Sequence, residues 1–99
     1  MLPSKRVLTH PGEILREEFL KPMNLSANAL ALALRVPANR ITAIINGERA
    51  VSADTALRLA RYFGTTAEFW INMQAAHDLT SARAELGKRI EAEVAKRVA

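Results

Sequence analysis

The stretch "VPANRITAIINGER", residues Val36–Arg49, decides the fold of this chain. Ile41, Ile44 and Ile45 recur at the i, i+3, i+4 spacing of a helix, so one side of this segment must be buried. At about 100° per residue, the other positions point away from the isoleucines. These positions are Asn39, Thr42, Ala43 and Asn46, with Arg40 at their flank. The pattern predicts a short, firmly anchored helix with an exposed polar face.

A second helix is predicted immediately before this stretch. Ser26 can cap it, and Ala27, Leu30, Ala31 and Leu34 supply a narrow apolar stripe. Only Arg35 and Val36 separate this helix from Pro37. Two helices joined by such a short turn, the second polar on its outer face, are typical of a helix-turn-helix, whose second helix enters the DNA major groove.

The remaining segments also predict helices. Pro11 suits the first position of a helix over 11–21, and Pro22 ends it. Ser52 and Gly64 bound a further helix, and Thr65 with Glu68 has capping-box spacing ahead of a fifth. Leu86, Ile90 and Val94 then repeat every four residues and predict an amphipathic helix over about 81–97.

The chain is therefore predicted to be all-α, a five-helix helix-turn-helix bundle with a C-terminal amphipathic helix. We expect a single domain over 1–99, with its core at about 11–79 and an N-terminal arm over 1–10. The connections are short and no linker or repeat interrupts them.

Composition narrows the classes of function. The 99 residues include no cysteine, which excludes disulfides and cysteine-based zinc sites and fits a reducing compartment. No apolar run is long enough for a membrane span, so we expect a cytoplasmic protein without a membrane partner. The net charge is +4, and the whole excess of Lys and Arg lies in residues 1–64. An acidic partner would meet that part of the chain, although such a charge also serves solubility.

Double-stranded DNA is a partner that suits these side chains. Asn pairs with adenine, Arg with guanine, and Thr contacts thymine in the major groove. Arg35, Arg49, Lys5 and Arg6 are predicted phosphate contacts, which position a protein without reading sequence. Ser26 lies at a helix N-terminus, where free N–H groups favour anions.

Three stretches resemble the HigA-type antitoxins: "HPGEILREEFL" (His10–Leu20), "NRITAIINGERAVSADTALRLARYFG" (Asn39–Gly64) and "TAEFWINMQAAHDL" (Thr66–Leu79). Leu25–Gly64 resembles more broadly the Cro/C1-type helix-turn-helix of phage repressors, which implies a λ-repressor-like bundle. The resemblance implies a homodimer that represses its own operon by binding operator DNA. It also implies that the protein neutralises a HigB-type toxin, a small basic RNase of RelE-like fold that cleaves mRNA.

The same resemblance assigns residues. It places base contacts on Ala38, Asn39, Arg40, Thr42, Ala43 and Asn46, and phosphate contacts near Ser26, Ala27 and Arg49. Two positions depart from the family pattern. Arg35 stands where a turn glycine is usual, so the turn is made either without a left-handed residue or at a cost. Ala27 replaces a commonly polar residue, which removes one expected DNA contact.

Two protein-binding surfaces are also predicted. Phe69, Trp70 and Met73 recur at helical spacing, which favours packing over a small-molecule pocket. A dimeric helix-turn-helix must hold its two recognition helices about 34 Å apart, so a rigid subunit contact is needed. We expect these three residues and His77 to form that dimer interface. Glu13, Glu17 and Glu18 make the first helix acidic. They are either a solvated face or a surface that attracts the basic toxin.

Catalysis has little support in the sequence. His10 and His77 are the only histidines and are predicted to lie far apart, with His10 at a helix start. No nucleophile–base pair, metal site or cofactor is predicted. The prediction is thus a non-enzymatic antitoxin and repressor. Two alternatives stay open: a stand-alone repressor without a toxin, and a protein-inhibitory module that no longer binds DNA.

Overall fold

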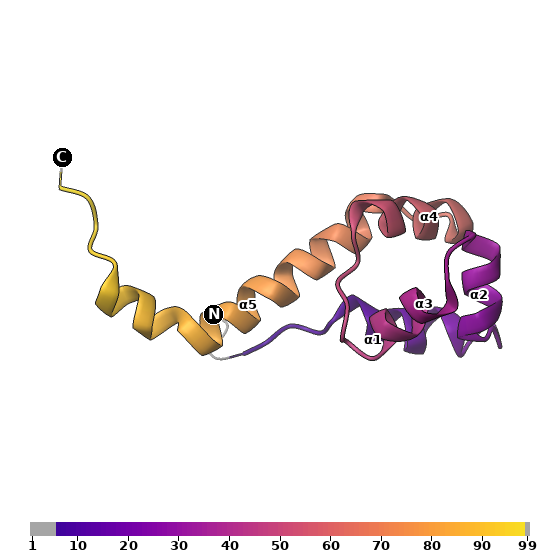
Figure 1. Ribbon diagram of the computed structural model, residues 1–99, viewed down its shortest axis with the longest axis horizontal. Helices are drawn as coiled ribbons and strands as arrows, with labels where there is room; N and C mark the ends of the chain where they lie inside the picture. Colours follow the sequence, from indigo (N-terminus) through magenta and orange to yellow (C-terminus); the bar gives the residue numbers. More distant parts are fainter. Residues whose placement is uncertain (1–5, 99) are drawn as a thin grey trace.

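The computed structural model describes residues 6–98, whose regular elements are all helices (Figure 1). The order is α1 (Pro11–Ile14), η1 (Leu15–Leu20), α2 (Ala27–Leu34), α3 (Ala38–Ile45), α4 (Ala53–Phe63) and α5 (Ala67–Glu93). The segment η1 is a π-helical continuation of α1 and forms with it a single first helix. Five helices and no strand within 6–98 confirm the predicted all-α fold.

Side-chain caps set where the later helices begin. Ser26 Oγ accepts from the Ala29 N–H at 3.0 Å, and Ser52 Oγ accepts from the Thr55 N–H at 3.3 Å. The fifth helix is capped by Thr66, not by Thr65 as the capping-box spacing predicted. Thr66 is the last extended residue before α5, and the Thr65 hydroxyl is used elsewhere, accepting from the Trp70 indole N–H at 2.8 Å.

The predicted fifth and sixth helices are one continuous helix, so the prediction of a break near residue 80 is wrong. α5 spans 27 residues without a proline. The Thr80 hydroxyl donates back to the carbonyls of Ala76 and His77, so it stays within the helix rather than capping a new one. The helix also ends earlier than predicted, at Glu93 rather than near residue 97.

The hydrophobic core lies behind α3 and holds it in place. Ile41 and Ile44 of α3 are fully buried together with Leu15, Leu30 and Leu59. Trp70 closes the other end of this core, and its ring centroid lies 5.2 Å from that of Phe19. Every helix thus contributes side chains to this core, and α3 packs mainly against α1 and α2.

The first helix approaches α3 unusually closely at Gly12. Gly12 is buried, and a Cβ atom built on it would collide with the backbone carbonyl of Ile44. Backbone atoms cannot move aside as a flexible side chain can. The absence of a side chain at Gly12 therefore allows the close approach of the first helix to α3.

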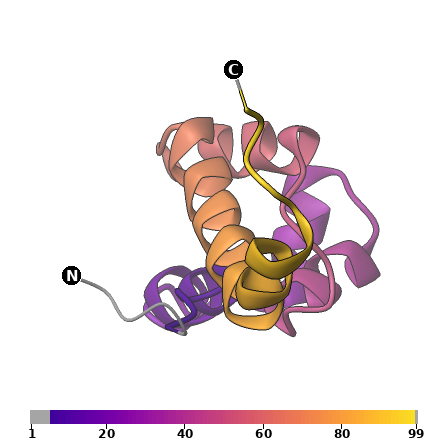
Figure 2. The same ribbon diagram turned by 90° about the vertical axis from the view of Figure 1, so that its left-hand side faces the viewer.

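The molecule is elongated because half of α5 projects from the globular part (Figure 1). Its extents are 52 × 25 × 24 Å, and its radius of gyration is 16.4 Å. A compact chain of this length would have about 13 Å. In the view along the long axis, α5 lies in front of the bundle and leads to the C-terminal segment (Figure 2).

The N-terminal arm is attached to α5 through a histidine pair. The Leu8 N–H donates to Thr80 Oγ1 at 3.0 Å, and the Leu8 carbonyl lies 2.7 Å from His77 Nδ1. The rings of His10 and His77 pack edge to face with their centroids 4.9 Å apart. The prediction that the two histidines lie far apart is therefore wrong, because the arm returns to a helix more than sixty residues away in sequence.

Lowering the pH should destabilise the protein through His10. His10 Nδ1 accepts from the Gly12 N–H at 2.9 Å and so caps the first helix as a neutral ring. Burial, and then the neighbouring His77, hold the pKa of His10 below its ordinary 6.5, although Asp78 and the Arg49 backbone partly oppose them. The unfolded chain therefore takes up this proton first, and the free energy of unfolding falls as the pH drops below 6.5.

Urea unfolding between pH 5 and 7.5 measures this dependence. His10→Asn supplies a cap that does not titrate, and it should show a shallower decrease below pH 6.5 than the wild type. Parallel curves for the two proteins would show that His10 does not carry the dependence.

Candidate nucleic-acid interface

The exposed face of α3 is polar and rigidly supported. Ala38, Asn39, Thr42 and Asn46 are exposed, whereas Ala43 is half-buried. The Thr42 hydroxyl lies 3.3 Å from the carbonyl of Asn39 within its own helix, so it must rotate to meet a partner. With Ile41 and Ile44 buried behind them, these side chains form a surface that can enter a groove without moving the helix.

The turn between α2 and α3 contains a left-handed arginine. Arg35 has φ 62° and ψ 45°, and the N–H of Val36 bonds the carbonyl of Ala31 at 3.0 Å across it. The turn therefore keeps the left-handed geometry without its usual glycine, at the cost of strain on an L-residue. Arg35 is exposed in the turn next to α3.

Arg35→Gly should stabilise the fold and weaken DNA binding. Glycine relieves the left-handed strain, which we expect to raise the free energy of unfolding by about 1 kcal/mol. If Arg35 contacts a phosphate as the sequence predicts, the variant should make the salt dependence of DNA affinity shallower by a slope of about 1. Urea unfolding and DNA titrations at several salt concentrations measure the two effects.

Asn24→Gly is the matched control, because Asn24 is also left-handed, with φ 51°, and asparagine tolerates this geometry better. Its stability should change less than that of Arg35→Gly. An Arg35→Gly variant that is no more stable than the wild type would contradict the strain at this turn.

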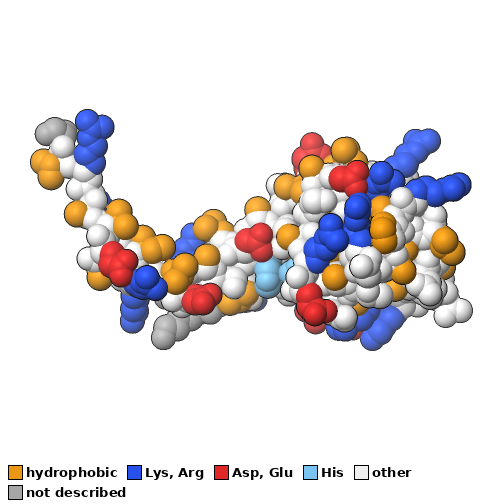
Figure 3. Space-filling view, in the orientation of Figure 1, with side chains coloured by type: hydrophobic (Ala, Val, Ile, Leu, Met, Phe, Trp, Pro, Cys, Tyr) orange, Lys and Arg blue, Asp and Glu red, His pale blue; other side chains and the backbone are white. Residues whose placement is uncertain are grey.

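Basic and polar groups flank α3 on several elements. Arg49 is exposed in the loop after it, and Ser26 is exposed at the start of α2. Arg16 and Lys21, which the sequence analysis did not select, share a surface groove with Ser26 and Ile45. Lys21 could have been found from its position shortly before the α2 cap at Ser26. Lys and Arg side chains gather on this globular end (Figure 3).

Three further residues were predicted as phosphate contacts: Ala27, Arg6 and Lys5. Ala27 is half-buried against the core and offers only its backbone. Arg6 is exposed on the arm that lies along α5. Lys5 lies outside the described residues.

Arg40 does not project freely from α3 as the helical spacing predicted. Its Nη1 donates to Asp54 Oδ2 of α4 at 2.7 Å, and its side chain is only 24% exposed. Asp54 also accepts from Arg58 at 3.2 Å. The hydrogen bond from Arg58, and next that from Arg40, hold the pKa of Asp54 below its ordinary value, so the carboxylate is charged at neutral pH.

The predicted dimer contacts are mostly occupied within the protomer. Trp70 is fully buried, so the prediction of a subunit contact there is wrong: its ring fills the protomer's own core. Met73 packs against the same core, and His77 binds the N-terminal arm. Only Phe69 of this group is exposed, at 40%.

The predicted toxin-binding carboxylates lie on the first helix. Glu13 and Glu18 are exposed, while Glu17 pairs with Lys21 at 3.0 Å and with Arg16 at 3.2 Å. Lys21, and then Arg16, hold the pKa of Glu17 below its ordinary value. Glu13 and Glu18 therefore carry the uncompensated charge of this face.

Two features are absent from the part of the chain that the structure describes. No helix there is long and apolar enough to cross a membrane. No three His, Asp or Glu side chains within 6–98 come together as ligands for a metal ion.

The fold and this surface define a DNA-binding protein of the helix-turn-helix class. The helix-turn-helix family model matches residues 16–70. Virulence-associated protein I of Dichelobacter nodosus is 63% identical over 73 residues, which cover 74% of this chain and 68% of that protein. Among solved structures, an addiction module antidote protein of a HigA family from Coxiella burnetii is 53% identical, with a TM-score of 0.85 over 93% of this chain and all of that one.

A second solved structure is the antitoxin HigA of Pseudomonas aeruginosa with the higBA promoter. It is 48% identical, with a TM-score of 0.86 over 91% of this chain and 98% of that one. The chain belongs to the helix-turn-helix family and, within it, to the HigA-type antitoxins. The predicted resemblance is confirmed, and this family consists of DNA-binding antitoxins and regulators rather than enzymes.

Proposed function

We propose that this protein binds operator DNA as a homodimer, represses its own operon and neutralises a HigB-type mRNA-cleaving toxin in the cytoplasm. The observation that carries the DNA-binding part is the rigid polar face of α3, set on buried isoleucines and flanked by basic side chains. The HigA relative solved with its promoter supports the same role.

On DNA, Asn39, Thr42 and Asn46 would face base edges, with Ala38 and the half-buried Ala43 packing between them. Arg35, Arg49 and the N-terminus of α2 at Ser26 would meet phosphates on either side. Because phosphate contacts release counterions, affinity should fall steeply with salt. Titration of the gene's own upstream DNA against a scrambled duplex tests this proposal, and equal affinity for both would contradict operator recognition.

The projecting half of α5 is the proposed dimer surface. Leu79, Leu86 and Ile90 are exposed at 58%, 37% and 51%, and Leu79 and Ile90 line a groove along this helix. Arg83 and Glu91 lie in the same groove, each four residues from Gly87. If a two-fold axis passes near Gly87, an antiparallel copy sets Arg83 against the partner's Glu91. The apolar side chains then face apolar side chains of the partner, and Arg83 and Glu91 face each other. A two-fold interface requires such self-complementarity.

Ile90→Glu should convert the dimer to a monomer. The variant places a carboxylate within the apolar stripe, next to Glu91, where burial without a partner is costly. Sedimentation velocity measures the state. Lys88→Glu is the matched control, because residue 88 lies roughly 200° around the helix from residues 86 and 90. A dimeric Ile90→Glu protein, or equal dissociation of both variants, would reject this surface.

The toxin is proposed to meet the exposed carboxylates of the first helix. Glu13 and Glu18 offer charge without internal partners among the described residues, and a basic toxin would be steered toward them. The direct test is growth of cells that express the adjacent small open reading frame, with and without this protein, followed by co-purification. Rescue with a stable complex supports the antitoxin role. A harmless neighbour, or one that stays toxic, would favour the stand-alone repressor.

Charge reversal maps the contact. Glu13→Lys with Glu18→Lys should slow association with the toxin and remove its salt dependence, whereas Glu68→Lys on α5 should not.

A further inference from the structure

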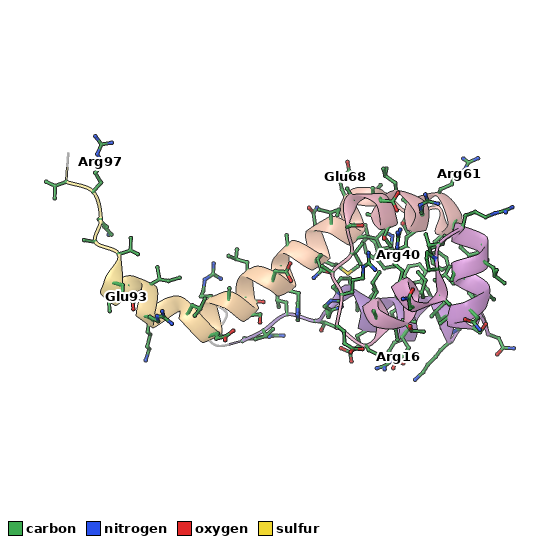
Figure 4. The ribbon with its side chains drawn as sticks, viewed as in Figure 1. Arg16, Arg40, Arg61, Glu68, Glu93 and Arg97 are labelled. Carbon is green, nitrogen blue, oxygen red and sulfur yellow. The ribbon has the colours of Figure 1, made fainter. Side chains whose placement is uncertain are left out.

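A chain of side-chain hydrogen bonds links α3 to α4, and α4 to the last residue of α2. Arg40 Nη1 of α3 donates to Asp54, at the start of α4, at 2.7 Å. Asp54 accepts in turn from Arg58 Nε, and Arg58 Nη1 donates to the carbonyl of Leu34 at 2.8 Å. Figure 4 shows Arg40 between α3 and α4, whereas Arg61 points away from the bundle.

Arg40 is held in this place by one acceptor. Its Nε is buried and has no hydrogen-bond partner among residues 6–98. A buried N–H without a partner is unfavourable, so the surroundings of the guanidinium do not themselves satisfy it. Two acceptors that together bind more of the N–H groups of Arg40 would compete well with Asp54. The O6 and N7 atoms of guanine are such a pair.

The position of Asp54 favours its ion pair with Arg40 over a contact between Arg40 and a DNA phosphate. It lies in the first turn of α4, where the helix dipole favours an anion, and it is half exposed. A DNA phosphate is a singly charged oxyanion like the carboxylate of Asp54, so the exchange of one for the other gains Arg40 little. A base edge offers two acceptors inside a groove.

We propose that Asp54 is a specificity-determining positioning residue that withholds Arg40 from DNA phosphates and releases it to a base edge of the operator. This inference rests on the proposed function. In a non-specific complex Arg40 stays with Asp54 and adds nothing to affinity. In the operator complex it changes partner.

The experiment compares Asp54→Asn with the wild type on two duplexes, the gene's own upstream DNA and a scrambled duplex of equal length and composition. Asp54→Asn should bind the scrambled duplex several-fold more tightly, and the slope of log affinity against log salt should steepen by about 0.9, the value of one added phosphate contact. The ratio of upstream to scrambled affinity should fall. In an Arg40→Gln background, Asp54→Asn should have no such effect.

Glu48→Gln is the charge control, because Glu48 is exposed in the turn after α3 and has no side-chain hydrogen bond or ion pair within the described part of the chain. An equal gain from Glu48→Gln, or a gain that persists in Arg40→Gln, would show that Asp54 acts only as a general negative charge and would overturn the proposal. So would a loss of affinity for both duplexes.

A measurement on the wild type needs no variant. The guanidinium NMR signals of Arg40 should show restricted rotation in the free protein, unlike those of the exposed Arg61. They should be unchanged by the scrambled duplex and shifted by the upstream duplex. Free rotation of Arg40 without DNA would overturn the inference alone. Binding to neither duplex would overturn the proposed function, and this inference with it.

Discussion

Gly12→Ala is expected to destabilise the fold and to abolish DNA binding. The added methyl group has no space, because it would meet the backbone carbonyl of Ile44. Overpacking of this kind costs about 3 kcal/mol, and the gain of about 1 kcal/mol in helix propensity offsets only part of it. We expect a net loss of about 2 kcal/mol or more, and a melting temperature lower by on the order of 10 °C.

The effect on function should exceed the effect on stability. To accommodate the methyl group, the first helix and the end of α3 must separate, which displaces Asn46 and the loop that carries Arg49. Thermal unfolding at a fixed protein concentration and DNA titration below the melting temperature measure the two losses separately.

Gly87→Ala is the matched control for helix propensity. A Cβ atom at Gly87 would meet only the flexible side chain of Arg83, at an ordinary 3.5 Å. This variant should be unchanged or stabilised by about 1 kcal/mol. If both variants were destabilised by similar amounts, the contact between Gly12 and the Ile44 carbonyl would not be the cause of the effect of Gly12→Ala.

Trp70→Ala is expected to have the largest effect on stability. The indole is fully buried, packs against the rings of Phe19 and Phe69, and donates to Thr65 Oγ1 at 2.8 Å. Removing such a side chain costs about 3–5 kcal/mol, a large part of the 5–15 kcal/mol that stabilises an ordinary protein. Urea unfolding followed by circular dichroism measures the loss.

Two controls separate the parts of this effect. Trp70→Phe keeps an aromatic ring in the core and should cost less, while Thr65→Ala removes the acceptor alone and should cost about 1 kcal/mol. A Trp70→Ala protein that unfolds like the wild type but dissociates into monomers would restore Trp70 to the subunit interface.

Much of the fold was predictable because its signals are local. The caps at Ser26 and Ser52 and the turn at Gly64 act within a few residues of their own positions. The buried face of α3 follows from the spacing of three isoleucines. The continuity of α5 was missed because the periodicity of Leu86, Ile90 and Val94 does not show where their helix begins. The hydrogen bonds from Thr80 to the preceding carbonyls show that no new helix begins there.

The features of the candidate site also divide into those that follow from local sequence and those that depend on the tertiary structure. The sequence by itself determined the helix-turn-helix and the polar face of its second helix, because both depend on neighbouring residues. Only the structure showed that the turn at Arg35 is left-handed and therefore strained. Tertiary structure alone decided that Gly12 lies against Ile44, that Arg40 is paired with Asp54, and that His10 meets His77. These contacts join positions distant in sequence, and periodicity and capping patterns carry no information on which helices pack together.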